Sequence, residues 1–393
     1  MKYIDQLPIA EKRVFIRVDF NTPMTAGGEV KDDTRIRAAL PTIRYALGQK
    51  AKIILASHLG RPKGKRDMKY TLNPVGKRLA ELLGDVDVVM TEDCVGDGVK
   101  SLANSLRPGQ IMLLENLRFH PEEEKNDEGF SKKLAELAEV YVNDAFGTCH
   151  RAHASTAGMT KFFDQKGGGF LLRNEVAYLS KITTNPERPL MAIVGGAKVS
   201  DKLAVLENLI NLVDELLIGG GMAYTFLAAK GIEIGKSIVE PDKIHSAKRI
   251  LERAETKGKR LFLPVDHIVA SEASANAIPL VTKDSSIPKE LAGFDIGPKT
   301  IELFSNEIAK AKTIFWNGPL GVFELKPFST GTIAIAKAIA KSGAISVVGG
   351  GDSLSAIKEA DVSSKISHLS TGGGASLEFV EGKKLPGLTA LEE

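Results

Sequence analysis

The chain has 393 residues, a length at which a single hydrophobic core stops growing, so two domains are expected. Hydrophobic residues make up 43% of the chain and charged residues 26%, a balance that excludes intrinsic disorder and is typical of a globular protein. A formal net charge of +3 is too small to indicate nucleic-acid binding by itself.

Cysteine content and apolar run lengths narrow the class further. Cys94 and Cys149 have no metal-ligand spacing and are too few for a disulfide framework, which predicts buried thiols in a reducing compartment. The N-terminal sequence has no uninterrupted apolar core, and no stretch of the chain approaches eighteen apolar residues. We therefore expect a cytoplasmic protein without an export signal or a membrane span.

In the first half of the chain, short apolar runs alternate with helix-like segments. This is the pattern of a doubly wound α/β fold, in which parallel strands are joined by crossover helices. The expected strands are residues 13–19, 51–58, 86–90, 110–116 and 140–144.

A run of three glycines at 167–169 precedes an expected helix at 170–182, and such a run makes a plausible hinge. We place the domain junction there. The expected N-terminal domain is 1–169 and the C-terminal domain is 170–375, with a tail at about 376–393 that returns to the first domain.

The second half repeats the α/β pattern, so the sequence predicts two similar α/β halves. The expected strands are residues 190–195, 215–220, 260–270, 312–318 and 344–350, and the clearest helices are 202–215 and 332–343. Residues 231–237, GIEIGKS, resemble a phosphate-binding Walker loop, but the glycine spacing is one residue short and a helix-like segment precedes them, so we expect an ordinary turn.

Polar residues follow the expected strands of the first half, where open α/β sheets hold their ligands. They are Asp19 and Asn21 after the first strand, Arg35 in the next segment, His58 and Arg61 after the second strand, Arg118 after the fourth and Arg151 after the fifth. The fork of donors on arginine matches phosphate and carboxylate groups. The first half therefore predicts a pocket for a small, highly anionic metabolite, although Asp19 also fits a simple turn cap.

Three glycine-rich turns follow strands of the second half. In residues 191–202, MAIVGGAKVSDK, two glycines precede an expected helix start that carries Lys198 and Lys202. Similar turns occur at 219–221 and at 349–351, the latter followed by Asp352 and Ser353. Small glycines let the backbone approach an anion, so the second half predicts a nucleotide site. Asp352 fits a helix N-cap and a magnesium-facing carboxylate about equally.

Nine motifs together carry a family resemblance. RVDFN, SHLGRP, LLENLRFH, NDAFGTCHRAHAST, GGAKVSDK, IGGGMAYTFL, WNGPLGVFE, VVGGGDS and STGGGASLE occur in the order, and over essentially the length, of the phosphoglycerate kinase family, which the chain resembles. The resemblance implies two Rossmann-like domains, each a mainly parallel sheet flanked by helices, joined by a hinge helix. It implies that the N-terminal domain binds 3-phosphoglycerate or 1,3-bisphosphoglycerate, that the C-terminal domain binds ADP or ATP with Mg²⁺, and that the protein is a monomer.

The resemblance also implies roles for individual residues. The implied substrate contacts are Asp19, Phe20, Asn21, Arg35, His58, Leu59, Gly60, Arg61, Arg118 and Arg151. The implied nucleotide contacts are Gly196, Ala197, Lys198, Lys202, Gly220, Gly221, Gly293, Asn317, Pro319, Glu324, Gly350, Gly351, Asp352 and Ser353, with Asp352 as the Mg²⁺ partner. The implied catalytic groups are Arg35, Lys202, Gly372 and Gly373.

The chemistry of such a reaction fits the residues present. The acceptor is a carboxylate, which is already ionised at neutral pH, so the transfer needs alignment and charge neutralisation and no general base. Two alternatives remain open from the residues alone: a kinase for another small carboxylate, and a non-catalytic protein that binds anions or RNA. The scarcity of aromatic side chains among the basic motifs disfavours RNA, and no nucleic-acid partner is expected.

Overall fold

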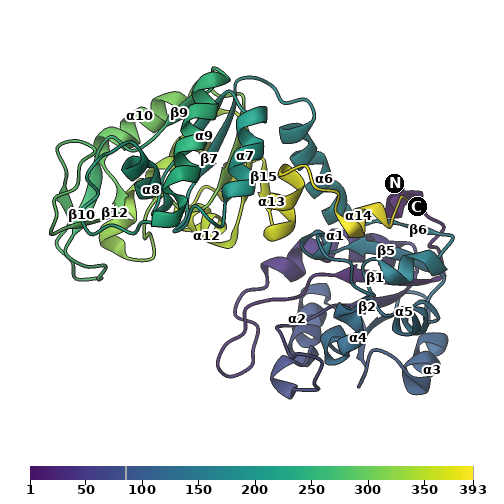
Figure 1. Cartoon of the computed structure of the whole chain (residues 1–393). Coiled ribbons are helices and arrows are strands. Elements are labelled where there is room, and N and C mark those ends of the chain that lie inside the picture. The colour runs from purple at the N-terminus through teal and green to yellow at the C-terminus, as the bar shows by residue number, and fades with distance from the viewer. Residues whose placement is uncertain (85, 393) are drawn as a thin grey trace. The chain divides into compact units, whose positions relative to one another are not determined.

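The computed structural model of the chain describes residues 1–84 and 86–392 (Figure 1). By their internal contacts these residues form two compact units. Unit 1 comprises residues 1–176 together with the C-terminal segment from Lys384 onward, and unit 2 comprises residues 177–383. The helix α6 (Phe170–Thr183) includes the residues at which unit 1 ends and unit 2 begins.

Unit 1 is built on a six-stranded sheet of order β3-β4-β2-β1-β5-β6, in which every pair is parallel. Its strands are β1 (Arg13–Val18), β2 (Lys52–Ala56), β3 (Val88–Met90), β4 (Ile111–Leu113), β5 (Val140–Asp144) and β6 (Lys166–Gly168). Its helices are α1 (Thr34–Gly48), α2 (Asn73–Leu83), α3 (Asp97–Ser105), α4 (Pro121–Glu124), α5 (Glu128–Ala135) and α14 (Pro386–Thr389). Helices lie on both faces of the sheet (Figure 1), and its central strands are accordingly almost entirely buried.

Unit 2 contains a second six-stranded parallel sheet, of order β15-β14-β13-β7-β8-β9, and a small antiparallel sheet of order β11-β10-β12. Its strands are β7 (Leu190–Val194), β8 (Glu215–Ile218), β9 (Arg260–Phe262), β10 (His267–Ala270), β11 (Leu280–Val281), β12 (Ala292–Ile296), β13 (Thr313–Asn317), β14 (Ile345–Gly349) and β15 (His368–Ser370). Its helices are α7 (Leu203–Leu212), α8 (Met222–Ala229), α9 (Ile244–Thr256), α10 (Pro298–Ile308), α11 (Thr330–Ser342), α12 (Gly351–Glu359) and α13 (Gly374–Val380).

The predicted fold class is confirmed, because each unit is an α/β layer structure around a parallel sheet. In unit 1 the chain proceeds to opposite sides of β1, so that β2 and β5 flank it. In unit 2 it does the same around β7, which β8 and β13 flank. Ligands of such sheets bind outside the carboxyl ends of the strands at this point of reversal. The topology therefore directs attention to the loops after β1 and β5 and to those after β7 and β13.

Several predicted elements differ from the structure. Residues 260–270, predicted as one strand, form the two strands β9 and β10 of different sheets, because Pro264 interrupts the run. Gly167 and Gly168, expected at a hinge, lie in β6 beside β5. The segment GIEIGKS follows α8 and forms turns, as expected.

The C-terminal region divides between the units. Helix α13 belongs to unit 2, where it packs against α7. The following segment belongs to unit 1, where Leu385 and Leu391 are buried and the Gly387 N–H donates to the Cys149 carbonyl at 2.9 Å. No helix among the described residues is both long and apolar enough to cross a membrane.

Candidate active site

A turn at the carboxyl end of β1 begins the candidate site of unit 1. The Asp19 carboxylate forms an ion pair with Arg35, from the first turn of α1, and accepts a hydrogen bond from the Asn21 N–H at 3.2 Å. Asp19 therefore stabilises the turn, as one of the two interpretations from sequence expected. The same carboxylate orients the Arg35 side chain, which remains 33% exposed and accessible to a ligand.

The loop after β2 is tied to this turn by hydrogen bonds. The Gly60 N–H donates to Asn21 Oδ1 at 2.8 Å. Leu59 is buried, and its backbone N–H and carbonyl both bond to the Asn116 side chain, at 3.2 and 2.8 Å. The buried Phe20 packs in the core beneath. The expected residues after β1 and β2 thus form one hydrogen-bonded edge.

His58 lies among positive charges on this edge. Its side chain is buried, and its Nδ1 lies 3.3 Å from Arg17 Nη2. Burial first, and then the charges of Arg17, Arg118 and Arg35, hold the pKa of His58 well below its ordinary value. His58 is therefore neutral at pH 7. A neutral imidazole beside three guanidinium groups marks a strongly positive field, which suits a polyanion.

Arg118 and Arg151 extend the positive field. Arg118 follows β4 in a 3₁₀ turn, and its Nη1 donates to the Gly60 carbonyl at 2.9 Å. Burial lowers the pKa of Arg118, and the nearby charge of the exposed Arg151 contributes. Arg61, also expected here, is exposed and makes no hydrogen bond or ion pair to any described residue. Arg35, Arg118 and Arg151 are therefore brought together, whereas nothing links Arg61 to them.

Arg17 belongs to this cluster although it was not predicted. It lies within β1, is 1% exposed, and its Nε donates to Ser155 Oγ at 2.8 Å. The Ser155 hydroxyl in turn donates to Glu123 at 2.5 Å. His153 was also missed as a neighbour of the cluster: burial and then the charge of Arg17 lower the pKa of this imidazole to about 4. The available signal was a charged residue inside an otherwise apolar strand, which is rarely buried without a partner.

In unit 2, two glycine-rich turns close around the loop after β13. The Gly196 N–H donates to the Pro319 carbonyl at 2.9 Å, and the Gly220 N–H donates to the Leu320 carbonyl at 3.1 Å. A Cβ atom at Gly195 would lie 2.1 Å from the Pro319 carbonyl oxygen, and one at Gly220 would lie 2.7 Å from it. Only glycine permits these loops to approach so closely.

The segment after Gly196 differs from the prediction. The predicted helix start at Lys198 is wrong, because α7 begins only at Leu203 and the preceding residues form turns. The Ser200 N–H and hydroxyl donate hydrogen bonds to the Glu240 carboxylate, at 3.1 and 2.5 Å, which tie this segment to the loop before α9. Ala197 and Lys198 are exposed, and Lys198 and Lys202 do not share a helix face.

Lys202 is the cation most closely built into the unit 2 site. Its ammonium group donates to the Asn317 side chain, which itself donates to the Gly349 carbonyl at 2.8 Å. Burial lowers the pKa of Lys202, while the negative charges of Asp201 and Asp352 oppose that shift. A partly desolvated ammonium with donors to spare is a favourable partner for phosphate oxygens.

The turn after β14 places Asp352 near Lys202. Gly350, with φ of +96°, occupies the N-cap position of α12, so the alternative of Asp352 as N-cap is wrong. Asp352 lies exposed in the first turn of the helix that begins at Gly351. Ser353 is buried, and its Oγ accepts a hydrogen bond from the Gly318 N–H at 2.7 Å. Lys202, Asn317 and Ser353, which follow β7, end β13 and follow β14, are thus brought together.

Other expected residues are placed farther along the unit. Gly372 and Gly373 follow β15, which pairs with β14, and the Gly372 N–H donates to Ser370 Oγ at 3.3 Å. Gly293 lies in β12, where a Cβ atom would meet the Tyr224 hydroxyl at 2.1 Å. Glu324 is exposed and lines a cavity of about 560 Å³ that also includes Phe323, Lys326, Ser329, Ile333 and Lys337.

Comparison with known proteins identifies the family. The family model described as phosphoglycerate kinase matches residues 4–383. The chain is 60% identical to the phosphoglycerate kinase of Anaeromyxobacter dehalogenans over 395 residues, and the match covers 100% of both chains. It is 57% identical to that of Acidobacterium capsulatum, with 99% of this chain and 98% of the relative covered.

Solved structures agree with this result. The phosphoglycerate kinase of Coxiella burnetii superimposes with a TM-score of 0.90 at 43% identity, covering 100% of this chain and 98% of that one. The enzyme of Pyrococcus horikoshii gives a TM-score of 0.84 at 33% identity, with the same coverage. The chain belongs to the phosphoglycerate kinase family.

Proposed function

We propose that the arginine cluster of unit 1 binds 3-phosphoglycerate or 1,3-bisphosphoglycerate, and that the glycine-rich loops of unit 2 bind ADP or ATP. As a phosphoglycerate kinase, the protein is a phosphotransferase that acts on the carboxyl group of 3-phosphoglycerate. It transfers the acyl phosphate of 1,3-bisphosphoglycerate to ADP, reversibly, in glycolysis and gluconeogenesis. The alternative of a non-catalytic anion- or RNA-binding protein is not favoured.

The observation that carries the assignment of unit 1 is the buried, neutral His58 surrounded by guanidinium groups. The folded protein keeps these like charges close together, and a bound polyanion would relieve their repulsion. We assign the substrate contacts to Asp19, Phe20, Asn21, Arg35, His58, Leu59, Gly60, Arg61, Arg118 and Arg151.

The assignment of unit 2 is supported by Lys202, whose burial penalises its charge until an anion arrives. Close-packed glycine turns beside it leave room for a phosphate chain near the backbone. We assign the nucleotide contacts to Gly196, Ala197, Lys198, Lys202, Gly220, Gly221, Gly293, Asn317, Pro319, Glu324, Gly350, Gly351, Asp352 and Ser353.

Asp352 fits a site for Mg²⁺ that is shared with the nucleotide. It is an exposed carboxylate in the first turn of α12, close enough to Lys202 to oppose the lowering of that lysine's pKa. Oxygen ligands from one carboxylate and from substrate phosphates are the usual environment of Mg²⁺ in kinases. Bound there, Mg²⁺ would neutralise phosphate charge, and Asp352 would hold it.

The transfer itself needs no proton to be removed. The attacking oxygen belongs to a carboxylate, which is ionised at pH 7, so alignment and charge stabilisation account for catalysis. We assign charge stabilisation to Arg35 and Lys202, and additional hydrogen bonds to the backbone N–H groups of Gly372 and Gly373. Closure of the two domains would exclude water, which otherwise hydrolyses the acyl phosphate.

A coupled assay of phosphoryl transfer from ATP to 3-phosphoglycerate tests these assignments. We expect Arg35→Ala and Lys202→Ala each to lower kcat by about 10²–10³, since each removes a charge that stabilises the transferring group. Matched controls are Arg37→Ala, an exposed arginine paired with Asp33 on the same helix, and Lys257→Ala, an exposed lysine after α9. Both controls should retain activity.

Two results would contradict the assignments. If Arg35→Ala or Lys202→Ala retains the kcat of the unaltered chain, that residue does not stabilise the transferring group. An increase in KM alone would mean that the residue contributes to ground-state binding and not to the transfer step.

We also propose that the protein is a cytoplasmic monomer. The support for the compartment is that Cys94 and Cys149 are both buried and form no disulfide, as is usual in a reducing compartment. The support for the monomer is the membership of the phosphoglycerate kinase family. A molecular mass of one chain by light scattering would support the monomer, and a dimer would overturn it.

A further inference from the structure

A group of three possible metal ligands lies in unit 1, outside the residues assigned to the substrate. Asp93 and Cys94 follow β3, and His120 follows the 3₁₀ turn after β4. Because β3 and β4 are adjacent parallel strands, the loops at their carboxyl ends lie side by side. One ligand atom from each of the three residues lies within 4.8 Å of the other two.

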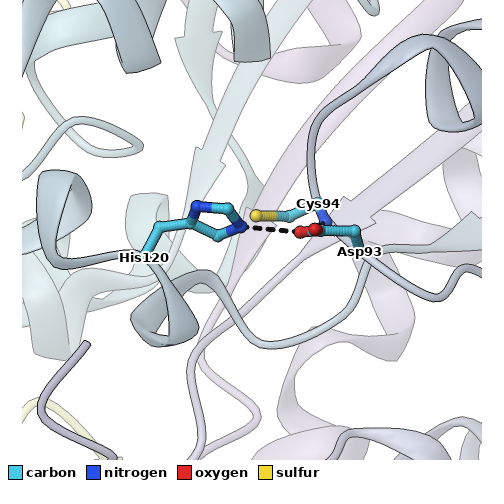
Figure 2. A group of neighbouring side chains, drawn as sticks. All are labelled: Asp93, Cys94 and His120. Atoms are coloured by element: carbon cyan, nitrogen blue, oxygen red, sulfur yellow. Dashed lines mark hydrogen bonds and ion pairs between the residues drawn. The ribbon is translucent and has the colours of Figure 1, made fainter. Parts of the chain in front are cut away.

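The three side chains converge on one point. His120 Nε2 lies 2.7 Å from Asp93 Oδ1. Figure 2 shows the Cys94 sulfur on the same side of the imidazole ring, beside the nitrogen that faces Asp93. In a nucleophilic Cys–His–Asp triad, the histidine would instead use one ring nitrogen for the cysteine and the other for the carboxylate. The convergence of all three groups is the arrangement of metal ligands.

The surroundings of the cysteine also disfavour a nucleophile. Cys94 is fully buried, and its charged neighbours are the carboxylates of Asp93 and Glu123. Reactive thiolates occupy positive environments. A thiolate at Cys94 would therefore need a directly bound cation to stabilise its charge.

An unpaired carboxylate oxygen lies near the same place. Glu122 follows His120 by two residues, and its carboxylate is close enough to interact with the His120 ring. Its Oε2 atom is buried and has no hydrogen-bond partner among the described residues. The local balance of charge therefore favours a bound cation.

The ligands are held in place by their own loops. Thr91 Oγ1 donates to the Asp93 carbonyl at 2.5 Å and accepts from the Glu115 N–H at 3.2 Å, which joins the loop after β3 to the end of β4. The His120 ring stacks on Phe130, with centroids 5.2 Å apart. Little rearrangement is needed to bind a metal, because tetrahedral zinc ligands lie roughly 3.3–3.6 Å from one another.

We propose that Asp93, Cys94 and His120 form a binding site for Zn²⁺, with water or Glu122 as the fourth ligand. The thiol sulfur, the imidazole nitrogen and a carboxylate oxygen are all zinc ligands, whereas Mg²⁺ prefers oxygen ligands alone. Binding forms bonds from zinc to Sγ, Nε2 and Oδ1 and breaks the Asp93–His120 hydrogen bond. The thiol proton and the proton that Nε2 donates to Asp93 are both released to solvent, and an imidazole that was neutral takes up a proton at Nδ1.

The ligand His120 is two residues from Arg118 on the same turn, so bound Zn²⁺ would also stabilise the segment that carries Arg118. This proposal does not depend on the assignment of the substrate residues.

Equilibrium dialysis of the chelator-treated full chain against Zn²⁺ tests the site. We expect one Zn²⁺ per chain, and an affinity lower by at least about tenfold in Cys94→Ser and in His120→Gln. Cys149→Ser, at the other buried cysteine, and His245→Gln, at an exposed histidine of α9, are matched controls that should bind as the unaltered chain does. Asp93→Asn replaces Cys94→Ser if the latter does not fold.

Co²⁺ in place of Zn²⁺ gives a readout specific to the sulfur. We expect an absorption band from sulfur-to-cobalt charge transfer in the unaltered chain and in Cys149→Ser, but not in Cys94→Ser. The proposal is overturned by absence of stoichiometric Zn²⁺, by equal binding in the ligand and control variants, by absence of the sulfur band, or by displacement of Zn²⁺ with excess Mg²⁺.

Discussion

Asp295 is a buried carboxyl that the proposed chemistry does not use. Its two oxygens accept hydrogen bonds from the Gly331 N–H at 2.7 Å and from the Ile296 N–H at 2.9 Å. Burial nevertheless dominates and raises the pKa of Asp295 to about 8. In the folded protein this carboxyl therefore keeps its proton at pH values where the unfolded chain has lost it.

A pH dependence of stability follows from this residue. The folded pKa is higher than the unfolded value of about 3.9, so the folded state binds more protons in the window between them. The contribution of Asp295 is fully present below about pH 4 and declines as pH rises to about 8. The unfolding free energy of the unaltered chain should fall between pH 5 and pH 8.5. In Asp295→Asn, whose side chain does not titrate, this fall should be smaller by on the order of a few kcal/mol.

Urea unfolding at the two pH values measures this effect through the fluorescence of Trp316, the single tryptophan of the chain, which is buried in β13 of unit 2. All other groups titrate alike in both proteins. The change in unfolding free energy between the two pH values therefore differs between the two proteins only by the contribution of Asp295. If the unfolding free energy changes equally with pH in the variant and in the unaltered chain, Asp295 is ionised in the folded state.

At the residue level, the sequence predicted the site residues at strand ends and missed the contacts between side chains of different loops. Arg35, His58 and Arg118 could be expected together because parallel strands end at one edge of a sheet. The meeting of Cys94 with His120 could not, because 26 residues separate them in sequence and only the pairing of β3 with β4 brings their loops together. Their spacing matches no metal motif, so the pattern alone excluded them.

Among the elements, the turn after β7 depends on the absence of a side chain. A Cβ atom at Gly195 would lie 2.1 Å from the Pro319 carbonyl oxygen and 2.8 Å from that of Gly318, both backbone atoms. One of the loops would have to move. We expect Gly195→Ala to lower the unfolding free energy by about 1–3 kcal/mol and to weaken ATP binding, because the displaced loop leads to Lys202.

Gly48→Ala is a matched control for that substitution. Gly48 is the last residue of α1, and an added Cβ atom there meets nothing within 4 Å. This change should leave the unfolding free energy unaltered or raise it by up to about 1 kcal/mol, since alanine favours the helix. Urea unfolding and calorimetric titration with ATP check both variants; a Gly195→Ala protein that binds ATP like the unaltered chain would refute the steric argument.

Elements that bury continuous apolar runs were predicted from sequence, and those with other compositions were not. The central strands β2, β7 and β13 contain such runs, β1 contains one that only Arg17 interrupts, and all four strands are confirmed. β6 contains Gly167 and Gly168 and has no apolar pattern; it forms because its backbone completes the sheet beside β5. Tertiary pairing, and not local preference, decides such short edge strands.

For the whole molecule, the last ten residues complete a domain that begins at residue 1. Leu385 and Leu391 are buried in unit 1, and Gly387 lies so close to Cys149 that a Cβ atom would be 2.9 Å from its Cα. Removal of the segment after Lys383 should destabilise unit 1 by several kcal/mol, since it deletes buried leucines and a backbone hydrogen bond. Unit 2, which has its own core, should be spared.

Hydrogen exchange measured by mass spectrometry distinguishes the two units. Amides of β1 and β5 should exchange faster after truncation, whereas those of β7 and β13 should be unchanged. Leu391→Ala is a milder form of the same change and should shift exchange in the same strands. Uniform acceleration in both units, or none in either, would contradict an effect confined to unit 1.

The discontinuity of unit 1 also has a consequence for synthesis of the chain. The ribosome synthesises the first 176 residues long before the segment from Lys384 onward. Unit 1 therefore cannot reach its final packing until that segment has been made. Unit 2 is continuous in sequence, so every residue that its core needs has been synthesised once residue 383 is made, before the last residues of unit 1. The domain made first is therefore the domain finished last, and nascent chains of this protein should depend on chaperones mainly through their N-terminal half.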